Sequence, residues 1–417
     1  MAGGDEPMTV CAIESAAEST SVSGPEITIT ADGAYAARLA GEGEDLYPER
    51  WTLDGPEPYA VQLPLAQPEE RGTDVLPLSD GRVLIRRSVA GRQLFSLVYP
   101  TGPGTGELPL GGIETASLVL LPPSPDGRRA YALVPGARST AVWLVVGGAF
   151  GPEHVAEVAG RCSGGVWLDR TGRMLALDRE QGAGGPVKAV TVDLERGGET
   201  TALLQIAEGS DDRLLLADPD SGLLLIRSNA AGHDRLGWGI MGSTLPVRFP
   251  ESLRLPDCAV RPFAVQPGQT LEPERCGVAL WIEGAAGSRL GLWQPSGGRL
   301  RQLAAPRGWL AGTGVWDARG ALRLPYVSGG RGECGLARLD AAGLFAREAA
   351  ARRNGVQGVQ GAQGVQGAQG VQGVPGASPA GETGPGRTGE TGPGEPREAR
   401  RPVPLQQAPL MGRKGLG

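Results

Sequence analysis

The sequence is poor in the residues that most often hold metal ions. Only two of its 417 residues are histidine, His154 and His233, and its five cysteines include no C-x-x-C pair. Common zinc sites take their ligands from closely spaced cysteine and histidine, so we expect no metal and no cofactor. The scattered cysteines favour reduced thiols, with a disulfide between Cys258 and Cys276 as the alternative in an oxidising compartment.

Familiar catalytic motifs are missing as well. We find no G-x-S-x-G nucleophile elbow, no H-E-x-x-H helix and no phosphate-binding G-x-x-x-x-G-K-[ST] loop. The only lysines, Lys188 and Lys414, lie outside any such loop. We therefore expect no catalytic residue. His233 beside Asp234 is the one acid–base pair that the sequence offers, and we interpret both as ordinary solvent-exposed residues of a hairpin connection.

The chain also lacks long apolar runs and a basic charge. No segment approaches the roughly 20 apolar residues of a membrane-spanning helix, and the first residues have no apolar signal region. The net charge of −6 gives no electrostatic footprint for nucleic acid. We expect a cytoplasmic monomer without a membrane span or a nucleic-acid partner. A start site further upstream would instead make export possible.

What the sequence does contain is a repeat. A short apolar run, a polar turn that ends in glycine, and a second apolar run recur along the first 345 residues. The turn glycines are Gly33, Gly81, Gly127, Gly172, Gly222 and Gly320. Their spacings are 48, 46, 45, 50 and 98, and a weaker copy near Cys276-Gly277 fills the double interval. Asp-Gly and Ser-Gly supply the positive φ that tight turns need.

A period of about 45 residues accommodates four strands, which is one propeller blade. A single blade cannot bury both of its faces, whereas blades in a ring cover one another. The repeat therefore predicts an all-β fold, a seven-bladed β-propeller over residues 1–345. Because the last copy is short, we expect Met8–Ile13 to supply its outer strand.

One copy of the repeat carries a resemblance. Ser124-Pro-Asp-Gly-Arg-Arg-Ala-Tyr-Ala-Leu133 resembles the repeat signature of WD40-like propellers of the TolB type, and Ser79-Asp-Gly and Ala31-Asp-Gly are weaker copies. The propeller domains of prolyl-oligopeptidase-family peptidases are similar. The resemblance implies a propeller, here without the catalytic domain of those peptidases.

Residues 346–417 differ in composition from the rest. Glycine recurs at every third position from Gly355 to Gly376, and Pro375 is the only proline in that run. The spacing resembles the Gly-X-Y rule of collagen. With so few prolines, we interpret the segment as a low-complexity, disordered tail.

These features favour a non-enzymatic scaffold that binds a protein or peptide. Connections between second and third strands should share one face of the ring, and their arginines favour an acidic partner. The alternatives are an enzyme with its active site in the central funnel and a structural protein oligomerised by the tail. The candidate binding residues are Arg86, Arg87, Arg92, Arg138, Arg179, His233, Arg235, Trp309 and Arg331.

Overall fold

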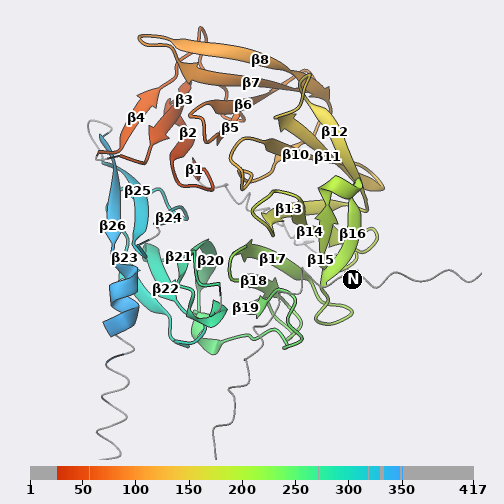
Figure 1. Ribbon diagram of the computed structural model, residues 1–417, viewed down its shortest axis with the longest axis vertical. Coiled ribbons are helices and arrows are strands. Elements are labelled where there is room, and N and C mark those ends of the chain that lie inside the picture. Colours follow the sequence, from red (N-terminus) through yellow and green to blue (C-terminus); the bar gives the residue numbers. More distant parts are fainter. Residues whose placement is uncertain are drawn as a thin grey trace, which may run out of the picture. The chain divides into compact units, whose positions relative to one another are not determined.

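The structure, a computed structural model, describes residues 26–347 and 350, except residues 56, 271, 318 and 329–332. Its regular secondary structure is almost entirely antiparallel strands, whose sheets are arranged around a common centre (Figure 1). The all-β, propeller-like architecture predicted from the repeat is confirmed. The expected closing strand Met8–Ile13 and the Gly-rich segment after residue 350 lie outside the described residues.

The first three sheets have four strands each, paired in sequence order from the centre outwards (Figure 1). The first contains β1 (Thr28–Ile29), β2 (Tyr35–Glu42), β3 (Asp45–Thr52) and β4 (Tyr59–Gln62). The second contains β5 (Asp74–Pro77), β6 (Val83–Val89), β7 (Arg92–Pro100) and β8 (Thr105–Glu114). The third contains β9 (Val119–Leu120), β10 (Ala130–Pro135), β11 (Ser139–Val146) and β12 (Glu153–Ala159).

The next sheet has seven strands in two antiparallel groups, joined by one parallel bridge between Lys188 and Asp212. Its first group contains β13 (Cys162–Trp167), β14 (Met174–Glu180), β15 (Val187–Asp193) and β16 (Glu199–Leu204). Its second group contains β17 (Asp212–Ala217), β18 (Leu223–Ser228) and β19 (Arg235–Ile240). The 3-10 helices η1 (Leu194–Arg196) and η2 (Glu251–Leu253) lie in the connections that follow β15 and β19.

Two sheets complete the described chain. The first contains β20 (Cys258–Val265), β21 (Val278–Gly284), β22 (Gly287–Trp293) and β23 (Arg301–Ala304), with η3 (Pro273–Arg275) between its first two strands. The second has three described strands, β24 (Val315–Trp316), β25 (Leu322–Ser328) and β26 (Glu333–Leu339). A helical segment over 341–347 follows, and it buries Ala341 completely.

The predicted glycine turns join the first and second strands of their sheets. All six glycines have positive φ, between 65° at Gly127 and 82° at Gly81. In the best-matching copy, the Asp126 carboxylate accepts a hydrogen bond from Arg128 N–H at 3.0 Å, and Gly127 N–H donates to Ser124 O at 2.9 Å. Only glycine adopts this left-handed backbone without cost, which explains why the repeat keeps it.

The apolar core lies between neighbouring sheets. Phe95 and Leu84 of the second sheet, for example, pack with Ala132 and Val145 of the third. The first and last sheets meet in the same way, since Trp51 and Leu53 form one cluster with Val327 and Leu336. Arg323 of β25 also donates to Leu53 O at 3.3 Å. The sheets of the described chain therefore form a closed ring.

The ring has two distinguishable ends. Glycine turns of neighbouring sheets touch one another, as Ser79 N–H donates to Gly127 O at 2.8 Å and Gly268 N–H donates to Asp220 Oδ2 at 3.3 Å. We call this the turn end. Because consecutive strands are antiparallel, the connections from second to third strands lie at the opposite end, which we call the loop end.

Cysteine pairing differs from the alternative considered above. Cys162, Cys258, Cys276 and Cys334 are all free thiols. Cys258 faces Gly284 in the β20–β21 ladder, whereas Cys276 precedes Val278 at the other end of that hairpin. A disulfide between Cys258 and Cys276 is therefore excluded by strand register. Among the described residues, no helix has the length and apolarity to cross a membrane.

Candidate binding surface at the loop end

The described connections between second and third strands lie at the loop end, but five candidate arginines belong to the flanking strands: Arg86, Arg87, Arg92, Arg179 and Arg235. Arg86 and Arg87 lie within β6, because the strand continues to Val89 and turns tightly at Ala90 and Gly91, both with positive φ. Arg86 donates to Asp74 Oδ2 at 2.7 Å. The expectation that Arg86 and Arg87 are connection residues is wrong, since the turn is shorter than the sequence indicated.

Arg87 is, in addition, held between two carboxylates. Its guanidinium lies 2.7 Å from Glu69 Oε1 and 2.8 Å from Glu107 Oε1. The hydrogen bond with Glu69 raises the pKa of Arg87 above its usual value, and the hydrogen bond with Glu107 adds to this. These residues border a cavity of about 410 Å³ with Leu65 and Val89. The arginine charge there is already balanced.

Other candidate arginines remain open to solvent or are partly so. Arg92 begins β7 with an exposed side chain, 3.7 Å from Glu114, and Arg138 is exposed in the β10–β11 connection. Arg179 is half-buried near the end of β14, and its Nη1 donates to Thr200 Oγ1 at 3.5 Å. Arg235 is paired with Glu251. Arg331 lies outside the described residues.

The two candidates that are not arginine, His233 and Trp309, differ in their exposure to solvent. His233 and Asp234 are exposed neighbours in the β18–β19 connection, and no hydrogen bond joins them within the described chain. Trp309, expected to be an exposed aromatic contact, is instead 8% exposed. Its Nε1–H donates to Thr313 O at 2.8 Å, and its ring packs against Phe263 at 5.7 Å between centroids. The loop that carries Trp309 folds inwards, so the expected exposure is wrong.

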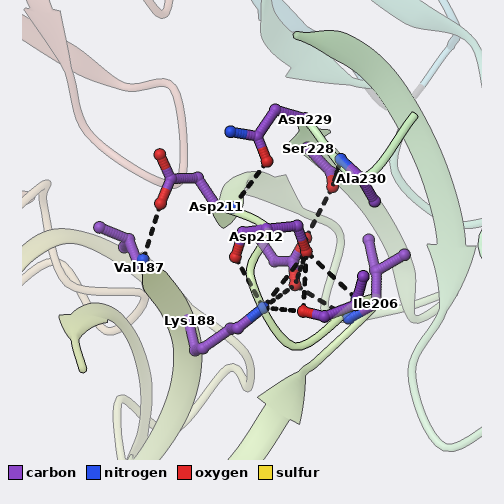
Figure 2. A network of polar contacts seen from close by, with 10 residues as sticks. Val187, Lys188, Ile206, Asp211, Asp212, Ser228, Asn229 and Ala230 are labelled. Atoms are coloured by element: carbon purple, nitrogen blue, oxygen red, sulfur yellow. Dashed lines mark hydrogen bonds and ion pairs between the residues drawn. The ribbon is translucent and has the colours of Figure 1, made fainter. Parts of the chain in front are cut away.

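A buried polar network supports the loop end between β15 and β17. Lys188 Nζ lies 2.8 Å from Asp212 Oδ2, and both side chains are at most 5% exposed. The ammonium also donates to Ser210 O at 2.6 Å and to Ala207 O. Figure 2 shows Lys188 directed at Asp212, with Ser228 and Asn229 close by. Buried charges are tolerated when paired and fully hydrogen-bonded in this way.

The same network fixes the connection that carries His233. Ser228 Oγ donates to Asp212 Oδ1 at 2.6 Å and accepts from Ala230 N–H at 3.1 Å. Asn229 Oδ1 accepts from Asp211 N–H at 2.8 Å (Figure 2). Burial raises the pKa of Asp212, but hydrogen bonds led by that from Lys188 outweigh it and hold the pKa below its usual value. The connection after β18 is therefore anchored on a rigid base.

An arginine cluster that the sequence interpretation did not find lies next to this base. Arg213 of β17 lies opposite Arg227 of β18 in the antiparallel ladder, and Arg261 of β20 lies near Arg227. Burial lowers the pKa of the Arg227 guanidinium; Asp234 acts against this, whereas Arg261 and Arg213 lower it further. The signal was available, since Arg213 and Arg227 lie seven residues on either side of Asp220 in the turn.

A cavity of about 270 Å³ opens between β19 and β20 beside this cluster. Its rim carries Arg227, Arg235 and Arg254, with Asp234 as the acidic residue, and Cys258 lies in its wall. Within the described residues, no cluster of three or more His, Cys, Asp or Glu side chains is arranged to hold a metal ion. The arrangement suits recognition of an anion rather than coordination of a cation.

No family model and no curated protein matches the chain. Among solved structures, it is similar to a prolyl endopeptidase, with 14% identity and a TM-score of 0.45 over 76% of this chain and 47% of that one. It is also similar to TolB from Acinetobacter baumannii, with 11% identity and a TM-score of 0.40 over 73% and 77% of the two chains. A third is Sqt1 from Chaetomium thermophilum bound to the N-terminus of ribosomal protein L10, with 13% identity and a TM-score of 0.42 over 76% and 85%.

The chain thus resembles TolB-type and WD40-like propellers, and it spans about half the length of the prolyl endopeptidase. At this level of identity the likeness concerns the fold alone. The strand order and the sheet-to-sheet packing of this chain carry the assignment of its architecture.

Proposed function

We propose that this protein is a seven-bladed β-propeller that binds an acidic protein or peptide at its loop end, without catalysing a reaction. The propeller comprises residues 1–345, and residues 346–417 are a tail outside it. The observation that supports the binding surface best is the set of solvent-accessible arginines at the loop end, described for Arg92, Arg138 and Arg179. Exposed charges of one sign steer and orient a partner of the opposite sign.

The proposed blade count is supported by dividing the seven-stranded sheet at its single parallel bridge. Antiparallel pairing connects strands within each group, and only the Lys188–Asp212 bridge connects the two groups. Separate core clusters then lie at seven junctions, including the one between the last and first sheets. Seven junctions between successive groups are what a ring of seven blades requires.

A catalytic alternative would use the centre of the ring. The inner strands β1, β5 and β9 border a cavity of about 440 Å³ that is lined by Glu26, Arg38 and Asp74, among others. However, Arg38 is paired with Glu49 at 2.7 Å, and Asp74 is paired with Arg86. Charges that neutralise each other are poorly placed to act on a substrate, which favours binding over catalysis.

The binding proposal can be tested with two matched triple variants of the full chain. One replaces Arg92, Arg138 and Arg179 with Gln at the loop end, and the other replaces Arg128, Arg196 and Arg319 at the turn end. Both lose the same charge. Partners captured by the parent from a cell extract should be lost by the first variant and retained by the second. Equal retention by both variants would rule out the loop end as the binding surface.

The tail and the oligomeric state are tested together. We propose that the protein is a monomer, since eight Gly-X-Y triplets with one proline are too few for a stable triple helix. Light scattering of the full chain should give the mass of one copy, 43.0 kDa. A trimer that becomes monomeric when residues 354–417 are removed would favour the structural alternative, oligomerisation by the tail.

A further inference from the structure

The cavity between β19 and β20 is lined by arginines and by apolar side chains. It differs from the cavity beside Arg87, where two carboxylates pair with the arginine. We call it the arginine pocket and define it by Arg227, Arg235 and Arg254 on its rim. Four apolar residues also line it, and we call them its floor: Leu236, Leu253, Leu255 and Val260. Leu236, Leu253 and Val260 are each at most 8% exposed. An apolar floor beneath a charged rim is typical of sites that take one side chain and orient its neighbours.

The positive charge of this pocket is only partly balanced by carboxylates of the described chain. Arg235 is paired with Glu251, but neither Arg227 nor Arg254 forms an ion pair with a carboxylate of the described chain. Arg227 donates only to Val260 O at 3.3 Å, and Arg254 is exposed. Asp234 is the only acidic residue among those that line the cavity.

The strand register adds further cations of the same sign. Arg213 lies directly opposite Arg227 in the β17–β18 ladder, although its Nη1 is also 3.7 Å from Asp178 Oδ2. Like charges directly opposite one another destabilise a sheet. Arg289 Nη2 lies 3.8 Å from Cys258 Sγ in the pocket wall, and a buried Arg289 Nε lacks a hydrogen-bond partner. Cations gathered at a structural cost, next to a cavity, indicate a site for an anionic group.

We propose that the arginine pocket is the anchor site for an acidic peptide segment: an aliphatic or aromatic side chain enters the Leu–Val floor, and an adjacent carboxylate binds Arg227 and Arg254. This inference rests on the proposed binding function and assigns it to one position between β19 and β20. Guanidinium groups suit this role because they bind carboxylates through two parallel hydrogen bonds.

The reactivity of Cys258 with charged and neutral reagents reports the electrostatic potential of the pocket without a ligand. Its half-buried thiol lies in the wall, and the half-buried Cys334, which has Glu49 nearby, serves as the internal control. Peptide-resolved mass spectrometry gives each thiol's alkylation rates with anionic iodoacetate and neutral iodoacetamide. The rate with iodoacetate divided by the rate with iodoacetamide should be higher at Cys258 than at Cys334. It should fall several-fold at Cys258 in Arg254→Gln and in Arg227→Gln.

Binding is then tested with defined peptides on the full-length protein. Immobilised hexapeptides with a central Leu-Phe flanked by Asp and Glu should retain the protein, whereas Asn and Gln counterparts should not. Affinity for the acidic peptides should fall about tenfold in Arg254→Gln, as expected for one lost charged hydrogen bond. Arg128→Gln at the turn end should leave the affinity unchanged. Bound acidic peptide should also slow alkylation of Cys258.

The outcomes distinguish the two proposals. If acidic peptides bind equally well to the parent and Arg254→Gln, and Cys258 is not protected, the arginine pocket is not the anchor, although the loop end can still bind through Arg92 and Arg138. If acidic and neutral peptides bind alike, or neither binds, both proposals are wrong. Arg254 is exposed, so its substitution cannot be confused with unfolding.

Discussion

At the scale of single residues, Lys188 has a structural role. It is the only lysine of the described chain, and its buried ammonium is paired with Asp212. We expect Lys188→Met to lower the free energy of unfolding in urea by about 3–5 kcal/mol, because an unpaired carboxylate would stay buried. Adding Asp212→Asn should recover part of the loss.

The control for this prediction is an exposed ion pair. Arg196 lies 3.3 Å from Glu199, with the two side chains 64% and 58% exposed, so Arg196→Met should cost no more than about 1 kcal/mol. The contribution of Asp212 to the free energy of unfolding should be complete above the usual carboxyl pKa. It should disappear at lower pH, where Asp212 is protonated in the folded protein as well, because its pKa there is lowered. Comparable losses from Lys188→Met and Arg196→Met would contradict this role.

For Asp178 we expect the opposite effect of ionisation on stability. Burial raises its pKa from 3.8 to about 6, although Leu214 N–H and Arg213 partly compensate. The folded protein therefore holds a proton that the unfolded chain releases, so ionisation of Asp178 lowers stability progressively between about pH 4 and pH 6 and by its full amount above that. We expect Asp178→Asn to raise the free energy of unfolding by up to about 3 kcal/mol at pH 7.5. The gain should shrink to about 1 kcal/mol near pH 4.5, and a pH-independent gain would disprove the cause.

At the scale of elements, the glycine turns do more than reverse the chain. A Cβ added to Gly127 would lie 1.7 Å from Ser79 Oγ in the neighbouring turn, and Gly127 also has a φ of +65°. Gly127→Ala should therefore cost about 2–4 kcal/mol from strain and overpacking. Gly182, with a φ of +81° and nothing within 4 Å of its Cβ position, is the control and should cost about 1 kcal/mol. Similar losses in thermal unfolding would show that packing between turns is unimportant.

These turns also explain how far the sequence could predict the structure. Asp-Gly pairs at a regular interval encode a local conformation, so the turns at Gly33 and Gly81 are predictable from the sequence alone. The arginine pocket depends on which strands face each other. Arg227 of β18 and Arg254, which lies between η2 and β20, are distant in the sequence and line the same cavity through inter-sheet packing. Trp309 was misjudged for a similar reason, because its burial depends on Phe263 in another strand.

At the scale of the whole molecule, the stability of the ring depends on how its ends are joined. The first and last sheets share a core in which Trp51 and Leu53 pack with Val327 and Leu336. Arg323 reaches across the same junction to Gly33 O at 3.5 Å. The last sheet nevertheless has only three strands among the described residues, with β26 as its outermost strand. An unpaired edge strand exposes backbone groups that another segment can satisfy.

We propose that Met8–Ile13 fills this position and completes the last sheet. Deleting residues 1–14 should then lower the melting temperature by at least about 5 °C, since hydrogen bonds along β26 and the cover over the junction would be lost together. Deleting residues 354–417 is the control and should leave the melting temperature within about 2 °C. Hydrogen exchange should quicken in β26 of the N-terminal deletion, whereas exchange in β6 of the second sheet should not change. An unchanged melt and unchanged exchange in β26 would mean that the ring closes through side-chain packing alone.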